Sequence, residues 1–168
     1  AVLAHALPAV QGDATQLRQL IHNLVQNAQE ALEDRVDGRV ELLTLAVTDR
    51  ETGNPRGVRL IVRDNGPGFP RKLMARALEP YVTTKVRGTG LGLAIVKKIV
   101  DDHGARIELA NLTDTEGRTA GAEVSVLFTR MAESVDNKVL AETDTRVAGD
   151  DDGNDTVGDR LPGADPAT

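Results

Sequence analysis

The sequence contains no cysteine and no tryptophan, and its aromatic residues are one tyrosine and two phenylalanines. Without cysteine, the chain has no disulfide framework and no thiolate metal site. The three histidines are isolated and lack the spacing of a zinc site. No run approaches the roughly 18 consecutive apolar residues that span a bilayer, so we expect no direct membrane contact. No signal-peptide pattern opens the chain, which favours a cytoplasmic domain, and the start without methionine is typical of a fragment.

The charge is unevenly distributed along the 168 residues. The formal net charge is −6, but residues 131–168 hold ten acidic and three basic side chains, a net −7. Residues 1–130 are therefore nearly neutral and have no basic stripe. Since aromatic side chains for base stacking are also scarce, nucleic acid is excluded as a partner.

The periodicity changes at about residue 130 and divides the chain into two predicted parts. Residues 1–130 contain regular apolar patterns and are long enough to form one domain with a core. Residues 131–168 are acidic and rich in glycine and proline, which predicts a disordered tail. The aspartates at 150–155 resemble a calcium loop in composition, but they lack the glutamate at the twelfth position and the flanking helices.

Helices and strands are mixed along residues 1–130. Apolar residues at helical spacing predict a long helix over 14–34, with Asp13 as its N-cap, and a second helix over 91–102 that ends at Gly104. Strands are expected at 39–48 and 58–63 as a hairpin, and at 105–110 and 122–128 as another. A short helix is expected over 71–78. The order indicates an α+β fold.

The most informative segment is the run Asp64-Asn65-Gly66-Pro67-Gly68-Phe69, directly after a predicted strand. A carboxylate at a strand end, followed by two glycines, allows the backbone to come close to a ligand. Asn-Gly and Pro-Gly pairs are also ordinary turn signals, so this run alone leaves a plain turn open.

Two further segments carry possible binding chemistry. Asn23 and Asn27 lie one helical turn apart on the first long helix, where an amide oxygen can bind a hard cation such as Mg²⁺ or simply face water. Gly88-Thr89-Gly90-Leu91-Gly92-Leu93 leads into the second long helix. Free N–H groups at a helix N-terminus favour phosphate, although such glycines can also form a hinge.

These segments together resemble a known family. Asn23…Asn27, Asp64-Asn65-Gly66-Pro67-Gly68 and Gly88-Thr89-Gly90-Leu91-Gly92 are similar to the N, G1 and G2 boxes of sensor histidine kinases. Glu79-Pro80-Tyr81-Val82-Thr83-Thr84-Lys85 resembles the F box, and the short spacer after it resembles nitrogen-regulation kinases of the NtrB and NtrY type. The resemblance implies the Bergerat fold of the GHKL superfamily, a two-layer sandwich with helices on one face of a mixed, mostly antiparallel sheet.

The resemblance also implies a role for each matching residue. Asp64 would accept a hydrogen bond from the adenine amino group of ATP, beside Gly66 and Gly68. Asn27 would hold Mg²⁺, with Asn23 on the phosphate side. The phosphates would be bound by Gly88, Thr89, Gly90, Leu91, Gly92 and Leu93, with Lys85 as a mobile cation and Arg87 as a weaker candidate. Two residues depart from the family pattern: Glu30, where many kinases have a basic residue, and Glu123 in the last strand.

The partners and alternatives follow from the same resemblance. His5, His22 and His103 lack the surroundings of a phosphoacceptor and are interpreted as structural or surface residues. The acceptor histidine would lie on a separate dimerisation domain, and a response regulator would receive the phosphoryl group. The full-length protein would be anchored in the bacterial inner membrane. The alternatives are a serine kinase of the anti-sigma-factor type and an ATP-binding module without catalysis. Asn23 stands where the hydrolysing members of the superfamily have a glutamate base, which favours a kinase.

Overall fold

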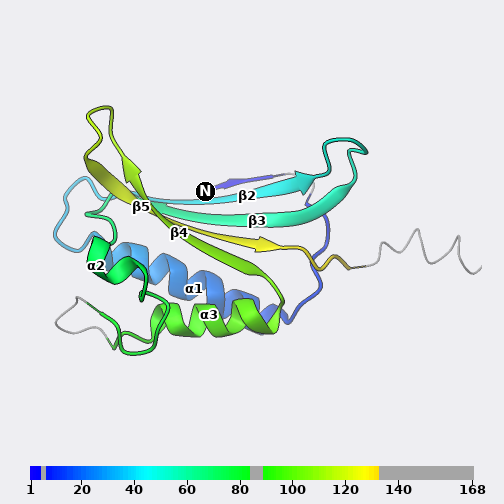
Figure 1. Cartoon of the computed structure of the whole chain (residues 1–168), viewed down its shortest axis with the longest axis horizontal. Helices are drawn as coiled ribbons and strands as arrows, with labels where there is room; N and C mark the ends of the chain where they lie inside the picture. The colour runs from blue at the N-terminus through cyan, green and yellow to red at the C-terminus, as the bar shows by residue number, and fades with distance from the viewer. Residues whose placement is uncertain (5–6, 84–88, 133–168) are drawn as a thin grey trace, which may run out of the picture. The chain divides into compact units, whose positions relative to one another are not determined.

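The computed structural model describes residues 1–4, 7–83 and 89–132, which form two layers. One layer is a five-stranded sheet in the order β1-β2-β3-β5-β4. Its strands are β1 (Val2–Leu3), β2 (Val40–Thr48), β3 (Pro55–Asp64), β4 (Arg106–Thr113) and β5 (Thr119–Phe128). In this sheet β1 and β2 pair in parallel, and the pairs β2–β3, β3–β5 and β4–β5 are antiparallel. The helices α1 (Ala14–Ala31) and α3 (Gly92–Asp102) lie side by side on one face of the sheet, and the short α2 (Arg71–Met74) lies near one end (Figure 1). The predicted α+β sandwich is confirmed.

Helix α1 begins at the residue that the sequence indicates. The Asp13 carboxylate accepts hydrogen bonds from the backbone N–H groups of Thr15 at 2.7 Å and Gln16 at 2.9 Å. These two bonds satisfy donors that the first turn would otherwise leave unpaired. They also hold the pKa of Asp13 below its usual value, because they stabilise the charged form.

The core lies between the two layers. Both helices contribute one apolar stripe, and the inner face of the sheet contributes alternate residues of its central strands. The buried cluster comprises Leu20, Leu24, Ala28, Leu60, Val62, Val96, Ile99, Val100, Val124, Val126 and Phe128. Each large side chain buried here stabilises the fold by roughly 1.5–3 kcal/mol relative to an exposed position. The layers are therefore fixed against each other by aliphatic packing, as the scarcity of aromatic residues requires.

His103 joins the end of α3 to the start of α1. Its Nε2 accepts a hydrogen bond from the backbone N–H of Asp13 at 3.1 Å, so its Nδ1 carries the proton that it donates to the Ile99 carbonyl at 2.7 Å. The ring is buried and meets the ring of Phe128 edge to face. The structural interpretation of His103 is confirmed. His22 is exposed on α1, and His5 lies outside the described residues.

Several element boundaries differ from the prediction. Helix α1 ends at Ala31 rather than 34, since a turn follows in which Arg35 N–H bonds the Leu32 carbonyl. Helix α2 ends at Met74 rather than 78, where single turns continue toward Pro80. The β4–β5 hairpin is longer than predicted because its pairing continues past a register shift at Leu112 and Thr113. Strand β1 was not predicted, since two residues carry no readable periodicity.

The outer face of the sheet accounts for Glu123, one of the two departures from the family pattern. Its carboxylate accepts a hydrogen bond at 2.6 Å from Arg63 Nε, on the neighbouring strand β3. Opposite charges directly across two strands stabilise the pair. The position of Glu123 therefore fits the sheet and lies away from the helices.

The described residues end just inside the predicted tail. The N–H of Ala132 still bonds the Ala9 carbonyl, and Met131 pairs with Val10. The rest of the predicted tail, 133–168, lies outside the described residues, so the division of the chain at residue 130 stays a prediction. Among the helices that the structure describes, none combines the length and the hydrophobicity needed to cross a membrane.

Candidate functional site

Asp64 lies at the end of β3, on the face of the sheet that the helices cover. Since side chains alternate along a strand, Asp64 shares this face with Leu60 and Val62, and only 9% of its surface is exposed. Its Oδ1 accepts a hydrogen bond from the Gly66 N–H at 2.8 Å. A Cβ at Gly66 would lie 2.7 Å from that oxygen and 3.3 Å from the Ala31 carbonyl. The chain therefore turns tightly beside a buried carboxylate, and the turn requires glycine at position 66.

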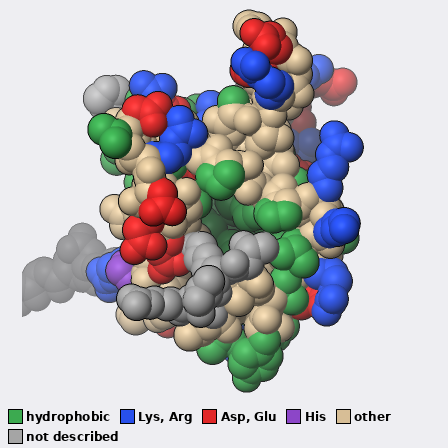
Figure 2. Space-filling view, turned by 90° about the vertical axis from the view of Figure 1, so that its left-hand side faces the viewer, with side chains coloured by type: hydrophobic (Ala, Val, Ile, Leu, Met, Phe, Trp, Pro, Cys, Tyr) green, Lys and Arg blue, Asp and Glu red, His purple; other side chains and the backbone are tan. Residues whose placement is uncertain are grey.

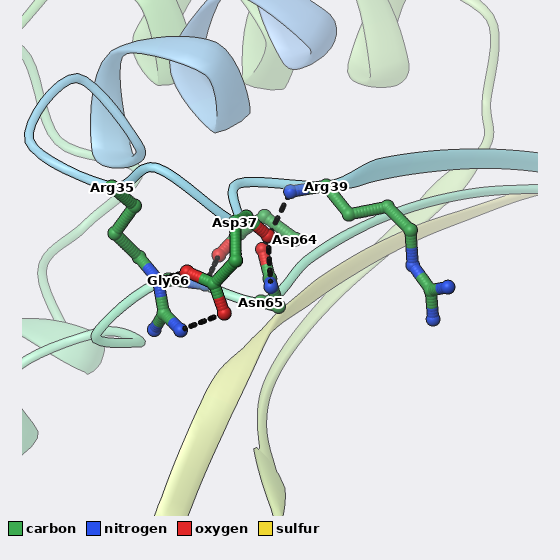
Figure 3. Close-up of polar contacts among 6 residues, drawn as sticks. All are labelled: Arg35, Asp37, Arg39, Asp64, Asn65 and Gly66. Carbon is green, nitrogen blue, oxygen red and sulfur yellow. Dashed lines mark hydrogen bonds and ion pairs between the residues drawn. The ribbon is translucent and has the colours of Figure 1, made fainter.

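Asn65 ties this turn to the loop between α1 and β2. Its Oδ1 accepts a hydrogen bond from the Arg39 N–H at 2.6 Å, and its Nδ2 donates to the Asp37 carbonyl at 2.9 Å (Figure 3). Arg35 holds the same loop through two hydrogen bonds to the Asp37 carboxylate. These bonds lower the pKa of Asp37, because the guanidinium stabilises its charged form. Asn65 is thus a structural residue of the motif.

Gly68 lies against the β4–β5 hairpin. Its φ of 75° is in the left-handed region, and a Cβ there would lie 2.5 Å from the Thr119 methyl and 2.8 Å from Asn111 Oδ1. The side chain of Asn111 also bonds both backbone groups of Phe69, accepting from N–H at 2.7 Å and donating to C=O at 2.9 Å. Sequence reasoning missed Asn111. Asn111 directly follows the predicted strand 105–110, and the structure places it inside β4, where asparagine is disfavoured.

Asn27 brings the first long helix to the start of the second. A Cβ at Gly92 would lie 3.0 Å from Asn27 Oδ1 and 3.1 Å from its Nδ2. Only a residue without a side chain at position 92 therefore lets the start of α3 pack this close to the amide of Asn27. One turn earlier, Asn23 Nδ2 is buried without a hydrogen-bond partner among the described residues. A buried donor of this kind costs free energy unless a ligand or water accepts its proton.

Residues 89–93, the α3 entrance, present backbone donors. Among the described residues no side chain caps the N-terminus of α3, so the N–H groups of its first turn have no side-chain acceptor there. The Leu91 N–H donates a long hydrogen bond to Thr89 Oγ1, with 3.4 Å between nitrogen and oxygen, and Leu93 packs its side chain against the core. Gly90 has a φ of 67°, and its carbonyl accepts a hydrogen bond from the Tyr81 N–H at 3.0 Å. Tyr81 and Gly90 therefore lie next to each other, although eight residues separate them in the sequence.

Most of the predicted site residues come to one end of the molecule. The end of β3, the start of α3 and the β4–β5 turn lie at the left-hand end of the described domain in Figure 1. The space-filling view of this end shows a hollow with hydrophobic side chains around it (Figure 2). The predicted residues Lys85 and Gly88, together with Arg87, lie outside the described residues.

The geometry combines two complementary features. A buried carboxylate at the end of β3 can accept a hydrogen bond, while the α3 entrance offers N–H donors and a helix dipole that favours negative charge. Amide oxygen on α1 adjoins those donors. A ligand that fits this arrangement is elongated, with a hydrogen-bond donor at one end and an anionic group at the other.

The chain matches known proteins over the same region. Residues 12–132, well over half of the chain, match the family of histidine kinase-, DNA gyrase B- and HSP90-like ATPases. An NtrY-like sensor histidine kinase of Rickettsia conorii is 46% identical over 99 residues, which are 59% of this chain. The sensory histidine kinase/phosphatase NtrB of Rhizobium leguminosarum bv. phaseoli is 44% identical over 110 residues, 61% of this chain. The matched regions are only 15% and 29% of these two relatives.

A solved structure agrees with these sequence relatives. Full-length ShkA in complex with AMPPNP superposes with a TM-score of 0.62 and 30% identity, covering 79% of this chain and 26% of that one. Both sequence relatives are sensor histidine kinases, which favours this interpretation over the serine-kinase alternative. The chain therefore belongs to the histidine kinase-, DNA gyrase B- and HSP90-like ATPase family and contains the ATP-binding catalytic domain of a sensor histidine kinase.

Proposed function

We propose that this domain binds Mg-ATP with the adenine at Asp64 and the phosphates at the α3 entrance. The observation that carries the proposal is the contact between Asn27 and Gly92, because it joins an oxygen ligand to uncapped helix donors. Neutral amide oxygen suits Mg²⁺ when phosphates supply most of the negative charge. The buried donor Asn23 Nδ2 fits a phosphate oxygen as its missing partner.

In this proposal the domain supplies positioning and charge neutralisation for phosphoryl transfer. Bound Mg²⁺ would neutralise charge on the β- and γ-phosphates, with Asn27 as its protein ligand. The N–H groups of the α3 entrance would orient the phosphate chain, and Asp64 would fix the other end of the nucleotide. A nitrogen of the acceptor histidine then forms a bond to the γ-phosphorus while the bond to the β,γ-bridging oxygen breaks, and ADP leaves with the electron pair.

The acceptor and the next partner belong to the same proposal. The acceptor histidine lies on a dimerisation domain of the longer kinase, and an aspartate of a response regulator receives the phosphoryl group afterwards. The longer protein is anchored in the inner membrane with this domain in the cytoplasm.

The test is calorimetric titration of the chain with ATP, with and without Mg²⁺, for wild type and Asn27→Ala. Wild type should bind ATP and bind it roughly ten times more tightly with Mg²⁺, a difference of about 1.4 kcal/mol in binding free energy. In Asn27→Ala this Mg²⁺ effect should be lost, while affinity in EDTA stays within about twofold of wild type. Gln29→Ala, at an exposed position of α1, is the control.

Two results would contradict the proposal. Persistence of the full Mg²⁺ effect in Asn27→Ala would place the metal elsewhere. An absence of ATP binding by the wild type would remove the nucleotide site.

A second experiment tests phosphoryl transfer. Addition of a histidine-containing dimerisation domain from an NtrB relative should yield acid-labile phosphohistidine from γ-labelled ATP. A labelled serine would instead support the serine-kinase alternative.

A further inference from the structure

Asn111 makes a two-point contact with a loop that is 42 residues away in the sequence. Its Oδ1 accepts from the Phe69 N–H at 2.7 Å, and its Nδ2 donates to the Phe69 carbonyl at 2.9 Å. The planar amide thus satisfies both backbone groups of one residue, as a neighbouring strand would. Two bonds from one rigid group fix the orientation of the Phe69 backbone as well as its position.

The loop that Asn111 holds is the one that carries the adenine-binding residues. We define the Asp64 loop as residues 64–69. At its start, Asn65 bonds the backbone of Asp37 and Arg39, and at its end Asn111 bonds Phe69. Between these two points lie Gly66 and Gly68, the residues with the least intrinsic preference for one backbone conformation.

The contact is specific rather than a consequence of strand formation. Asn111 lies inside β4, where asparagine is disfavoured and an apolar residue would pack more favourably. Its side-chain oxygen also lies 2.8 Å from the position that a Cβ on Gly68 would occupy. The amide therefore fills the space that the left-handed turn at Gly68 leaves open, and it does so with its polar atoms paired.

We propose that Asn111 is a positioning residue of the nucleotide site, which acts through the Phe69 backbone to hold the Asp64 loop in its ATP-binding conformation. This inference rests on the proposed function. A loop that is ordered before binding loses less conformational entropy when the ligand binds. Removal of the contact between Asn111 and Phe69 should therefore weaken nucleotide affinity. Because Asn111 acts at the adenine end, ATP and ADP should be affected alike, and the Mg²⁺ effect should be unchanged.

The experiment compares Asn111→Ala and Asn111→Asp with wild type and with Asn54→Ala. Asn54 is exposed in the turn between β2 and β3, at the opposite end of that hairpin from Asp64, and provides the same chemical change elsewhere. Calorimetry gives Kd for ATP and ADP at a temperature where circular dichroism shows every variant folded. Hydrogen exchange at the Phe69 amide reports directly on its hydrogen bond to Asn111.

We expect Asn111→Ala to raise Kd for both nucleotides by about tenfold and to speed exchange at Phe69, with Asn54→Ala within twofold of wild type. The isosteric Asn111→Asp keeps the acceptor and removes the donor, so it should lose affinity in the same direction. This variant carries the test if the alanine variant does not fold.

Three results would overturn the inference. Folded Asn111 variants with Kd values within twofold of wild type would show that the contact between Asn111 and Phe69 is structural only. The ATP-binding proposal would remain intact. A loss confined to ATP, or a loss of the Mg²⁺ effect, would place the action of Asn111 at the phosphates. A wild-type chain that binds no ATP would overturn both proposals together.

Discussion

The Asp64 loop and the α3 entrance lie at the same end of the molecule but are held in different ways. The Asp64 loop is bonded to the α1–β2 loop through Asn65 and to β4 through Asn111. The α3 entrance has no side-chain cap among the described residues, and it follows Tyr81, a non-glycine residue with a φ of 64°. One end of the site is thus complete in the protein alone, while the other keeps donors for a ligand.

This difference matches the chemistry that each end would perform. A flat, neutral base is recognised by a fixed acceptor in a shaped pocket, so pre-ordering the Asp64 loop increases affinity. A polyphosphate carries the charge that satisfies open N–H groups, so a capped helix start would compete with it. The comparison predicts that changes in the Asp64 loop affect both stability and binding, whereas changes near the α3 entrance affect stability little.

The largest effect on nucleotide binding is expected for Asp64→Asn. The amide oxygen of asparagine can still accept the Gly66 N–H, but the charged acceptor for a base amino group is lost. Affinity for ATP should fall by about 100-fold, in line with the roughly 1.5–3 kcal/mol attributed to a hydrogen bond with a charged partner. Calorimetry measures it, and Asp49→Asn in the β2–β3 turn is the isosteric control. Unchanged affinity would remove Asp64 from the site.

The second effect concerns Gly68→Ala. Both the left-handed φ and the contacts with Thr119 and Asn111 oppose a Cβ, so the free energy of unfolding should fall by about 2–4 kcal/mol. Gly117 has a φ of 76° with nothing within 4 Å of a Cβ. Gly117→Ala should therefore cost only about 1 kcal/mol, from backbone strain alone. Urea unfolding measures the free energy of unfolding of both variants. Equal losses would mean that the contact of Gly68 with the β4–β5 hairpin has room for a Cβ.

The smallest effect is expected for Tyr81→Gly, next to the α3 entrance. The tyrosine side chain is 78% exposed, so little apolar burial is lost, and glycine relieves the left-handed backbone. The free energy of unfolding should rise by less than about 1 kcal/mol. Tyr81→Ala removes the ring but keeps the strain and should show no gain. A clear loss of stability in Tyr81→Gly would show that the ring holds the segment in place.

The sequence predicted the elements whose pattern is local. The helical spacing of Leu20, Leu24 and Ala28 was sufficient for α1, and the Asp13 cap could be read from residue type alone. Asp64 and the glycines after it could be named because a strand pattern ends there. The ends of the elements were less predictable. Helix α1 ends at Ala31, and the loop after it is held by a hydrogen bond from the Arg39 N–H to Asn65, which is 26 residues away in the sequence.

The role of each residue within the motifs depended on distant contacts. Asn65 and Gly68 belong to the same short run as Asp64, yet the structure assigns them to loop anchoring and to contact with the hairpin. Asn111 carried no motif, because its partner Phe69 is 42 residues away. Lys85 and Gly88 lie outside the described residues, so the roles that the family resemblance implies for them stay predictions.

What the sequence by itself determined is the set of chemically competent groups: a carboxylate at a strand end, two asparagines on one helix face and glycines before a helix. Their order along the chain also indicated the family. Only the tertiary structure decided which of these groups meet, because the contacts of Asn27 with Gly92 and of Asn111 with Phe69 join segments that are separated by tens of residues. The physical reason is that periodicity records which face a residue shares with its neighbours, while the packing of helices on the sheet decides what that face meets.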